Sequence, residues 1–102
     1  MSFGNLARMA HQMQSEMARV QGELATLTLD GSAGGGAVRA TVNGKGELVS
    51  VAIDPDVVAG ADIEMLQDLV MAAVNDALRA ARAEAERRMA AITGGLRLPG
   101  LG

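Results

Sequence analysis

The chain has 102 residues, with 12 acidic side chains, nine basic side chains and no cysteine. A chain of this length forms one small domain, and its formal charge of −3 argues against a general polyanion binder. Without cysteine there is no disulfide framework, no Cys-based metal site and no thiol nucleophile. A single aromatic residue indicates a marginal core, which an oligomer would enlarge.

Charge is distributed unevenly along the chain. Residues 1–46 carry +1, residues 47–76 carry −7 without any basic residue, and residues 77–102 carry +3. No apolar run approaches the roughly 18 residues of a membrane span, and the N-terminus shows no signal-peptide pattern. We therefore expect a soluble cytoplasmic protein with an acidic middle and a basic C-terminal part.

Residues 2–27 are predicted to form the first helix. Apolar side chains recur there every three or four positions, which is the spacing of one helix face. The stripe consists of Leu6, Met9, Met13, Met17, Val20, Leu24 and Leu27. We interpret it as core or helix interface rather than as a ligand site. His11, the single histidine, has no cysteine or second histidine to complete a metal site, and a solvated position is expected for it.

Three antiparallel strands are predicted next. Residues 27–30 alternate in polarity and predict a short first strand, which the glycine-rich residues 31–36 then end. Residues 37–42 alternate again, so the glycine run is interpreted as a hairpin connection. A phosphate-binding loop would instead open a helix. The Asn-Gly-Lys-Gly sequence of residues 43–46 predicts a second hairpin, and the third strand ends before Pro55.

The pairing of the second and third strands follows from the hairpin length. A loop of two or four residues places Val38, Ala40 and Val42 on the same face as Val49, Val51 and Ile53. We expect the helices to pack on this apolar face. The reverse face is neither clearly polar nor clearly apolar, which suits a subunit interface. Arg39 and Lys45 are expected at the surface or at that interface, away from the tips of the helices.

Residues 62–92 are predicted to form one helix, about 45 Å long. Asp62 can cap its first N–H groups, and neither proline nor glycine follows before Gly94. A domain of this size cannot wrap so long a helix. The first half has a full apolar side made of Ile63, Leu66, Leu69, Val70, Ala73, Val74 and Ala77. The second half has a thin one made of Ala81, Ala85, Met89 and Ile92. We expect the second half to project as a lightly packed arm.

The predicted fold is therefore α+β, with a helix, a three-stranded antiparallel sheet and a long C-terminal helix. Residues 1–93 are expected to form the domain, and residues 94–102 a flexible apolar tail. If both long helices pack on one side of the sheet, their free ends point the same way. Arg8 and His11 would then lie near the arginines at the far end of the last helix, which are Arg82, Arg87 and Arg88.

Short motifs recur in a specific order over nearly the whole chain. They are Gly34-Gly35-Gly36, Val42-Asn43-Gly44-Lys45-Gly46-Glu47, Ile53-Asp54-Pro55, Asp68-Leu69, Asn75-Asp76-Ala77, Thr93-Gly94-Gly95-Leu96 and Pro99-Gly100. As a set they resemble the YbaB/EbfC family of bacterial nucleoid-associated proteins. The resemblance implies a homodimer joined through the sheet region, with projecting helical arms that bind double-stranded DNA with limited sequence preference. It also implies a nucleoid or cytoplasmic location and roles in gene regulation or DNA repair.

DNA binding requires basic side chains spaced along a projecting element, because these neutralise backbone phosphates. The candidates are Arg8, Arg79, Arg82, Arg87, Arg88 and Arg97, with Arg19 as a further possibility. An ordinary solvated helix remains an alternative for some of them. Arg82 with Glu86, and Arg88 with Glu84, are spaced for pairs within one helix.

A second functional hypothesis is a protein-interaction module. In that case the Met- and Ala-rich arms and the apolar tail would contact another protein, without direct DNA binding. Asp54 and Asp56 flank Pro55, but they have no nucleophile or histidine in evident reach, so turn formation explains them better than acid–base chemistry. We expect no enzymatic activity, no cofactor, no metal, no membrane partner and no small-molecule substrate.

Overall fold

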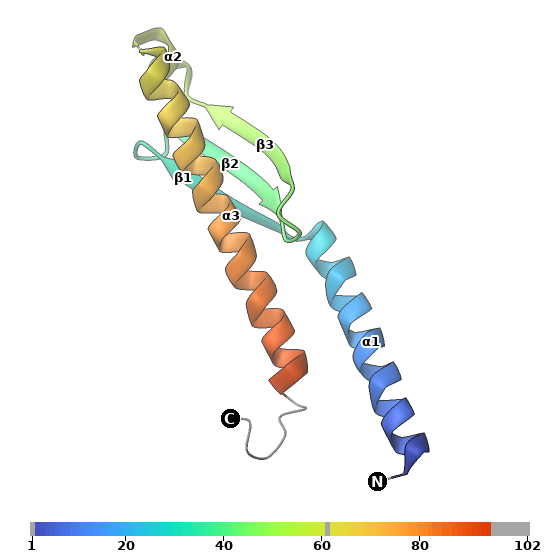
Figure 1. Ribbon diagram of the computed structural model, residues 1–102. Helices are drawn as coiled ribbons and strands as arrows, with labels where there is room; N and C mark the ends of the chain where they lie inside the picture. The colour runs from blue at the N-terminus through green and yellow to red at the C-terminus, as the bar shows by residue number, and fades with distance from the viewer. Residues whose placement is uncertain (1, 61, 95–102) are drawn as a thin grey trace.

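The computed structural model describes residues 2–60 and 62–94. In order, these residues form α1 (Phe3–Thr26), β1 (Thr28–Ala33), β2 (Val38–Asn43), β3 (Leu48–Ile53), α2 (Pro55–Gly60) and α3 (Ile63–Gly94). The predicted α+β order is confirmed, and the connector after β3 forms the short helix α2. The free ends of α1 and α3 point the same way, as expected (Figure 1). The radius of gyration is 19.7 Å, well above the ~13 Å of a compact domain of this length.

Both long helices begin at the residues that the sequence predicts. The Ser2 hydroxyl accepts a hydrogen bond from the Asn5 backbone N–H (3.3 Å) at the start of α1. The Asp62 carboxylate accepts one from the Glu64 backbone N–H (2.9 Å) at the start of α3. These side chains satisfy N–H groups that lack a partner within the helix. At its other end α3 continues through Gly94, two residues beyond the predicted boundary.

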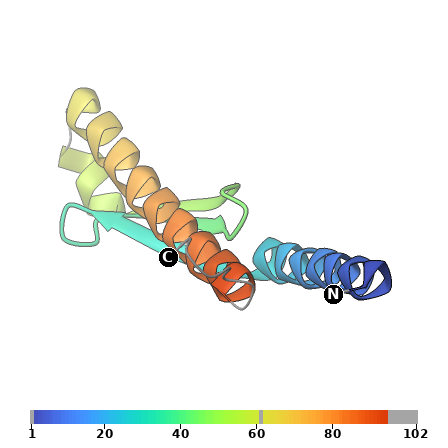
Figure 2. The ribbon, with the colours of Figure 1, turned by 60° about the horizontal axis from the view of Figure 1, so that its bottom comes forward.

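The sheet is an antiparallel meander in the order β1-β2-β3. The prediction that the first strand ends at Asp30 is wrong, because β1 continues through Gly31 to Ala33. A Cβ atom on Gly31 would lie 2.2 Å from the Ala77 backbone N and 2.4 Å from the Ala73 backbone O. Gly31 therefore lets α3 cross the sheet closely over β1 and β2 (Figure 2).

The predicted pairing of β2 with β3 is confirmed in part. Val38 and Ala40 pair with Ile53 and Val51, and a bulge then makes Val42 pair with Leu48. The expectation that helices cover the apolar face of β3 is wrong, because α3 packs on β1 and β2. Most of β3 is exposed as a result, with 52% of the Leu48 surface accessible. The edge of the sheet is thus an uncovered apolar strand.

The core is small and lies between β2 and α3. Its buried residues are Val38, Ala40, Val42, Ala73, Ala77 and Ala81. Alanines on the helix side keep α3 close to the strands, and Leu66, Leu69, Val70 and Val74 pack around them as predicted. Ile63, also expected on the packed side, is 72% exposed. It lies in the first turn of α3, beyond the strands that the helix covers (Figure 1).

The apolar stripe of α1, expected to be core or helix interface, is mostly uncovered in the described chain, so most of it is not core. Val20 and Leu24 are buried near the C-terminal end of the helix. Leu6, Met9 and Met17 are exposed. The N-terminal part of α1 extends away from the sheet, which the helix meets only at its C-terminal end. Nothing in the described chain therefore covers its first turns (Figure 2).

Candidate nucleic-acid interface

Two helical segments extend beyond one end of the sheet. Thr28 pairs with Asn43, so the β2–β3 loop of residues 44–47 lies where α1 joins the sheet. The α3 residues that line a pocket with this loop are Leu78, Ala81, Arg82 and Ala85. Residues 86–94 therefore reach past the sheet, and we call them the α3 arm. We call α1 the α1 arm; both are visible in Figure 1.

An ion pair fastens the two arms together. The Arg88 guanidinium donates from Nη1 to Glu23 Oε2 (3.0 Å) on α1 and from Nε to Glu84 Oε1 (2.9 Å) on its own helix. The Arg88 side chain is only 25% exposed. The pair of Glu84 with Arg88, which the sequence spacing predicted, is thus formed and is joined by a carboxylate from the other arm.

Further charges extend this contact into a network. Arg19 donates at 2.6 Å to both Glu16 and Glu23, and Arg87 pairs with Glu84. Together with Arg88 the network contains three guanidinium groups and three carboxylates, so its net charge is zero. Much of the basic character expected of the arms is therefore neutralised internally.

The network perturbs the pKa values of its members. Hydrogen bonds from Arg87 and then Arg88 lower the pKa of Glu84 to about 2. The hydrogen bond that Arg87 donates to Glu84 raises the pKa of Arg87, and those that Arg19 donates to Glu16 and Glu23 raise the pKa of Arg19. Both effects follow because each partner stabilises the charged form of the other. The carboxylate of Glu84 therefore remains ionised well below neutral pH.

The remaining candidate arginines differ in their surroundings. Arg79 is exposed, and its Nη2 lies 3.7 Å from Asp76 Oδ1 on the same helix. Arg8 and Arg82 are exposed, and within residues 2–60 and 62–94 neither has an ion-pair partner. The predicted pair of Arg82 with Glu86 is thus not formed. Arg97 lies outside the described residues.

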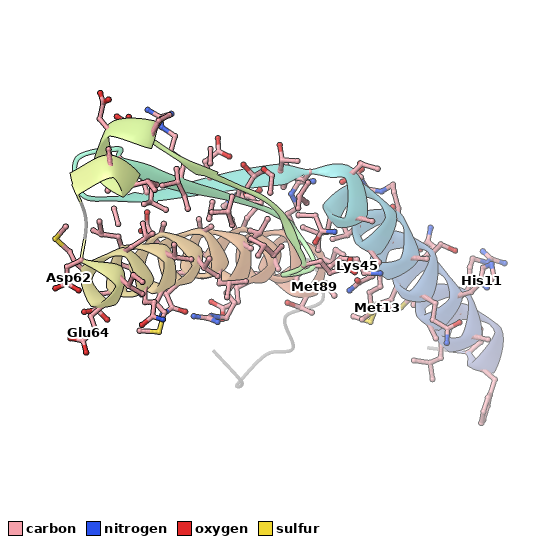
Figure 3. All side chains as sticks on the ribbon, turned by 90° about the horizontal axis from the view of Figure 1, so that it is seen from above. His11, Met13, Lys45, Asp62, Glu64 and Met89 are labelled. Atoms are coloured by element: carbon pink, nitrogen blue, oxygen red, sulfur yellow. The ribbon has the colours of Figure 1, made fainter. Side chains whose placement is uncertain are left out.

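The expectation that Arg8 lies near the arginines of the last helix is wrong. Arg88 contacts Glu23, and Arg8 is fifteen positions earlier on α1, about 22 Å away along a helix. The α1 arm extends farther than the α3 arm and carries Arg8 beyond it. His11 instead lines an apolar groove with Met9, Met13 and Ile92, and Figure 3 shows it toward the free end of α1.

Lys45, which the sequence analysis placed away from the tips of the helices, lies at the root of the arms. It lines the same pocket as Arg82, which for its part is beside the sheet rather than at the helix tip. The signal was available in the topology. Because α1 leads directly into β1, and β1 and β2 are antiparallel, the β2–β3 hairpin must lie where α1 joins the sheet.

An acidic segment of the chain lies at the opposite end of the molecule. Figure 3 shows Asp62 and Glu64 at the start of α3, far from Lys45 and Met89. Residues 47–76 contain seven acids and no base, and five of those acids lie between Asp54 and Asp68. The charge of the chain is thus separated along its long axis, which directs a polyanion to the arm end.

Other kinds of site have no support in the described part of the chain. Residues 2–60 and 62–94 contain no group of three or more metal-ligating side chains placed to hold an ion. None of the helices in this part is both long enough and apolar enough to cross a membrane.

The comparison with protein families shows to which family the chain belongs. The sequence model of the YbaB/EbfC DNA-binding family matches residues 1–96. The chain belongs to the YbaB/EbfC family. The resemblance of the motifs is thereby confirmed, and this is a family of DNA-binding proteins rather than enzymes.

Relatives of this YbaB/EbfC protein agree with the assignment. A nucleoid-associated protein of Thermoanaerobacter pseudethanolicus is 51% identical over 98% of this chain and 90% of its own length. One of Moorella thermoacetica is 50% identical over 98% and 99%, respectively. The crystal structure of an uncharacterised Helicobacter pylori protein matches with a TM-score of 0.75 and 29% identity. It covers 95% of this chain and 99% of that protein, so the helix–sheet–helix architecture is shared.

Proposed function

We propose that this YbaB/EbfC protein binds double-stranded DNA as a homodimer, mainly through phosphate contacts from its helical arms. The observation that carries the proposal is the pair of arms projecting from one end of the sheet, with arginines along both. Its relatives are named nucleoid-associated proteins, which supports a role in organising the nucleoid in the cytoplasm and in gene regulation. Five of the twelve acidic residues lie at the other end, between Asp54 and Asp68, where they do not repel the duplex.

The ion pairs on the arms are compatible with phosphate binding. Exposed ion pairs contribute roughly 0–1 kcal/mol, so a phosphate can replace an exposed carboxylate at little cost. Arg87 is 69% exposed and Arg79 is 63% exposed. Arg8 and Arg82 have no carboxylate to exchange within the described residues. We assign phosphate contacts chiefly to these four, and propose Arg97 as a fifth.

Arg88 has a different role in this proposal. Two carboxylates hold its side chain, Glu23 from α1 and Glu84 from α3. If the Arg88 side chain turned away from these carboxylates to bind a phosphate, Glu23 and Glu84 would face that phosphate and repel it. Arg88 therefore sets the spacing of the arms, and Arg19 supports it by holding Glu23.

The edge strand β3 supports the dimer. Leu48, Val49 and Val51 are exposed on it by 52%, 59% and 39%. An uncovered apolar edge strand readily pairs with another chain. A second copy of the protein would bury these side chains and enlarge a core that is small for one chain.

The proposal is tested by binding of a fluorescent arbitrary-sequence duplex to an Arg82→Gln/Arg87→Gln variant, which leaves the Arg88–Glu23 contact in place. The matched control is Arg39→Gln, which removes a charge from the sheet. We expect the arm variant to bind at least about tenfold more weakly, which corresponds to ~1.4 kcal/mol, and the control to bind with nearly wild-type affinity. Equal affinities for both variants would contradict the arm assignment.

One observation favours a second candidate, a protein-interaction module. The first turns of α1 expose an apolar stripe, with Phe3 at 91% and Leu6 at 51%, and apolar side chains of this kind suit a helical partner. Apolar docking would hardly respond to salt, whereas phosphate contacts respond steeply. Deleting residues 95–102 should weaken partner binding under this alternative and leave most DNA affinity under the first.

A further inference from the structure

Lys45 and Arg82 contribute two cationic side chains to one pocket where the arms leave the sheet. Both side chains line one pocket, whose other walls are Gly44, Gly46, Leu78, Ala81 and Ala85. Neither has an ion-pair partner among the described residues, although arginines on both neighbouring helices do. Two cationic side chains that line one pocket without a paired carboxylate attract an anion, because opposite charges attract.

The backbone under Lys45 is held in one conformation. The Asn43 carboxamide oxygen accepts hydrogen bonds from the backbone N–H of Lys45 (3.0 Å) and of Glu47 (3.1 Å). The Gly46 N–H donates to the Asn43 carbonyl (3.0 Å), and Gly46 has a φ of 84°, which favours glycine. The Glu47 carboxylate is itself occupied by the Asn43 amide (2.9 Å). Lys45 therefore extends from a rigid turn rather than from a mobile loop.

The turn is also attached to α1. The Gly44 N–H donates to the carbonyls of Leu24 (2.8 Å) and Leu27 (3.0 Å). A Cβ atom on Gly44 would lie 2.7 Å from the Leu24 oxygen, so the close approach depends on glycine. On its other side the turn faces α3, where Gly46 lies near Leu78. The cationic pair is thus fixed relative to both arms.

The shape of the pocket suits a small tetrahedral anion. Glycines on the loop and alanines on α3 form much of its wall, and Leu78 is its one large apolar side chain. Most of the wall therefore leaves room for an anion beside the two cationic residues. A guanidinium and an ammonium group offer several N–H donors for the oxygens of one phosphate.

We propose that Lys45 and Arg82 bind a single backbone phosphate of DNA between them at the root of the arms. This inference rests on the proposed function, because the phosphate belongs to the duplex that the arms hold. The site lies where the sheet begins, so it would mark the end of the surface along which the duplex contacts the arms. It adds one contact from the body of the protein to those of the helices.

The test is a double-mutant cycle with Lys45→Gln, Arg82→Gln and the double variant, titrated with a labelled duplex at several salt concentrations. Each phosphate contact contributes about 0.9 to the slope of log affinity against log salt. We expect each single variant to lose about one such contact and the double variant to lose no more than either. Arg39→Gln should retain the wild-type slope.

Distinct results overturn this inference. Wild-type slopes in both single variants would show that neither side chain contacts phosphate, and a loss twice as large in the double variant would show two separate contacts. If inorganic phosphate shifts the ¹⁵N signals of both side chains while both variants keep wild-type DNA affinity, the ligand is the free ion. In all of these cases wild-type binding to DNA leaves the proposed function standing, whereas absence of any wild-type binding removes it.

Discussion

Arg88 and Glu23 lie 65 positions apart in the chain, and their side chains meet at 3.0 Å between the two arms. No helix-periodic pattern in the sequence pairs them. Their contact is the place where the α3 arm is held against α1, and the spacing of the arms depends on it. The proposed DNA binding depends on this contact, because it fixes how the arginines of the two arms lie relative to one another.

Replacing Arg88 with Gln should loosen the arms without unfolding the protein. The free energy of unfolding should fall by less than about 1 kcal/mol, because Glu23 is 42% exposed and solvent screens the pair. The arm spacing is measured by double electron–electron resonance between spin labels at Ala18→Cys and Ala90→Cys. The labels can be placed specifically because the chain has no cysteine. Labelled chains are diluted with unlabelled ones.

We expect a broader distance distribution in Arg88→Gln than in the doubly labelled parent. Arg79→Gln is the matched control, since its ion pair with Asp76 stays within α3. An unchanged distribution in Arg88→Gln would show that packing alone holds the arms.

The arms should also respond to acid through Glu84. Its pKa is lowered from 4.5 to about 2, so its ionised form is favoured in the folded protein. The stabilisation is fully present above pH 4.5 and is lost as the pH falls toward about 2. A ¹³C-carboxyl titration should show this low pKa, and Arg87→Gln should raise it. A wild-type Glu84 that titrates near 4.5 would refute the network.

Two glycines should respond in opposite ways to substitution by alanine. Gly31→Ala places a methyl group 2.2 Å from the Ala77 backbone N and should destabilise the fold by about 2–3 kcal/mol. Gly22→Ala meets nothing within 4 Å on an exposed helix face and should stabilise it by about 0.5–1 kcal/mol. Urea unfolding of both variants measures the difference. Similar values would mean that α3 does not pack on β1 as described.

Charge placed on the edge strand should disrupt the proposed dimer. Val49 is 59% exposed on β3, so Val49→Lys disturbs little within one chain but would introduce a charge at the joined edge. Light scattering should then show a monomer. Leu6→Lys removes a similarly exposed apolar side chain from α1 (51%) and should leave the dimer intact. A dimeric Val49→Lys variant would move the interface elsewhere.

Local features of the fold could be predicted from the sequence. The cap at Asp62, the helical spacing of α3 and the break before Pro55 depend on neighbouring residues, and the elements form as expected. The family motifs are also readable along the chain.

Contacts between distant segments could not be predicted in the same way. From the local sequence, Gly31 looked like a strand break. A glycine is required there because Ala73 and Ala77 of α3 approach the strand closely, and no local pattern shows that contact. Leu48 is exposed on β3 because α3 packs on β1 and β2 instead. The place of Lys45 beside Arg82 follows from strand topology rather than from local pattern.

The central claim is tested most directly by titrating the wild-type protein with a labelled, arbitrary-sequence duplex at low and raised salt, with its mass measured by light scattering. The account predicts a dimer whose log affinity falls with log salt by about 0.9 for each phosphate contact. A protein that does not bind the duplex even at low salt would contradict it, and the exposed stripe of α1 would then direct the search to a protein partner.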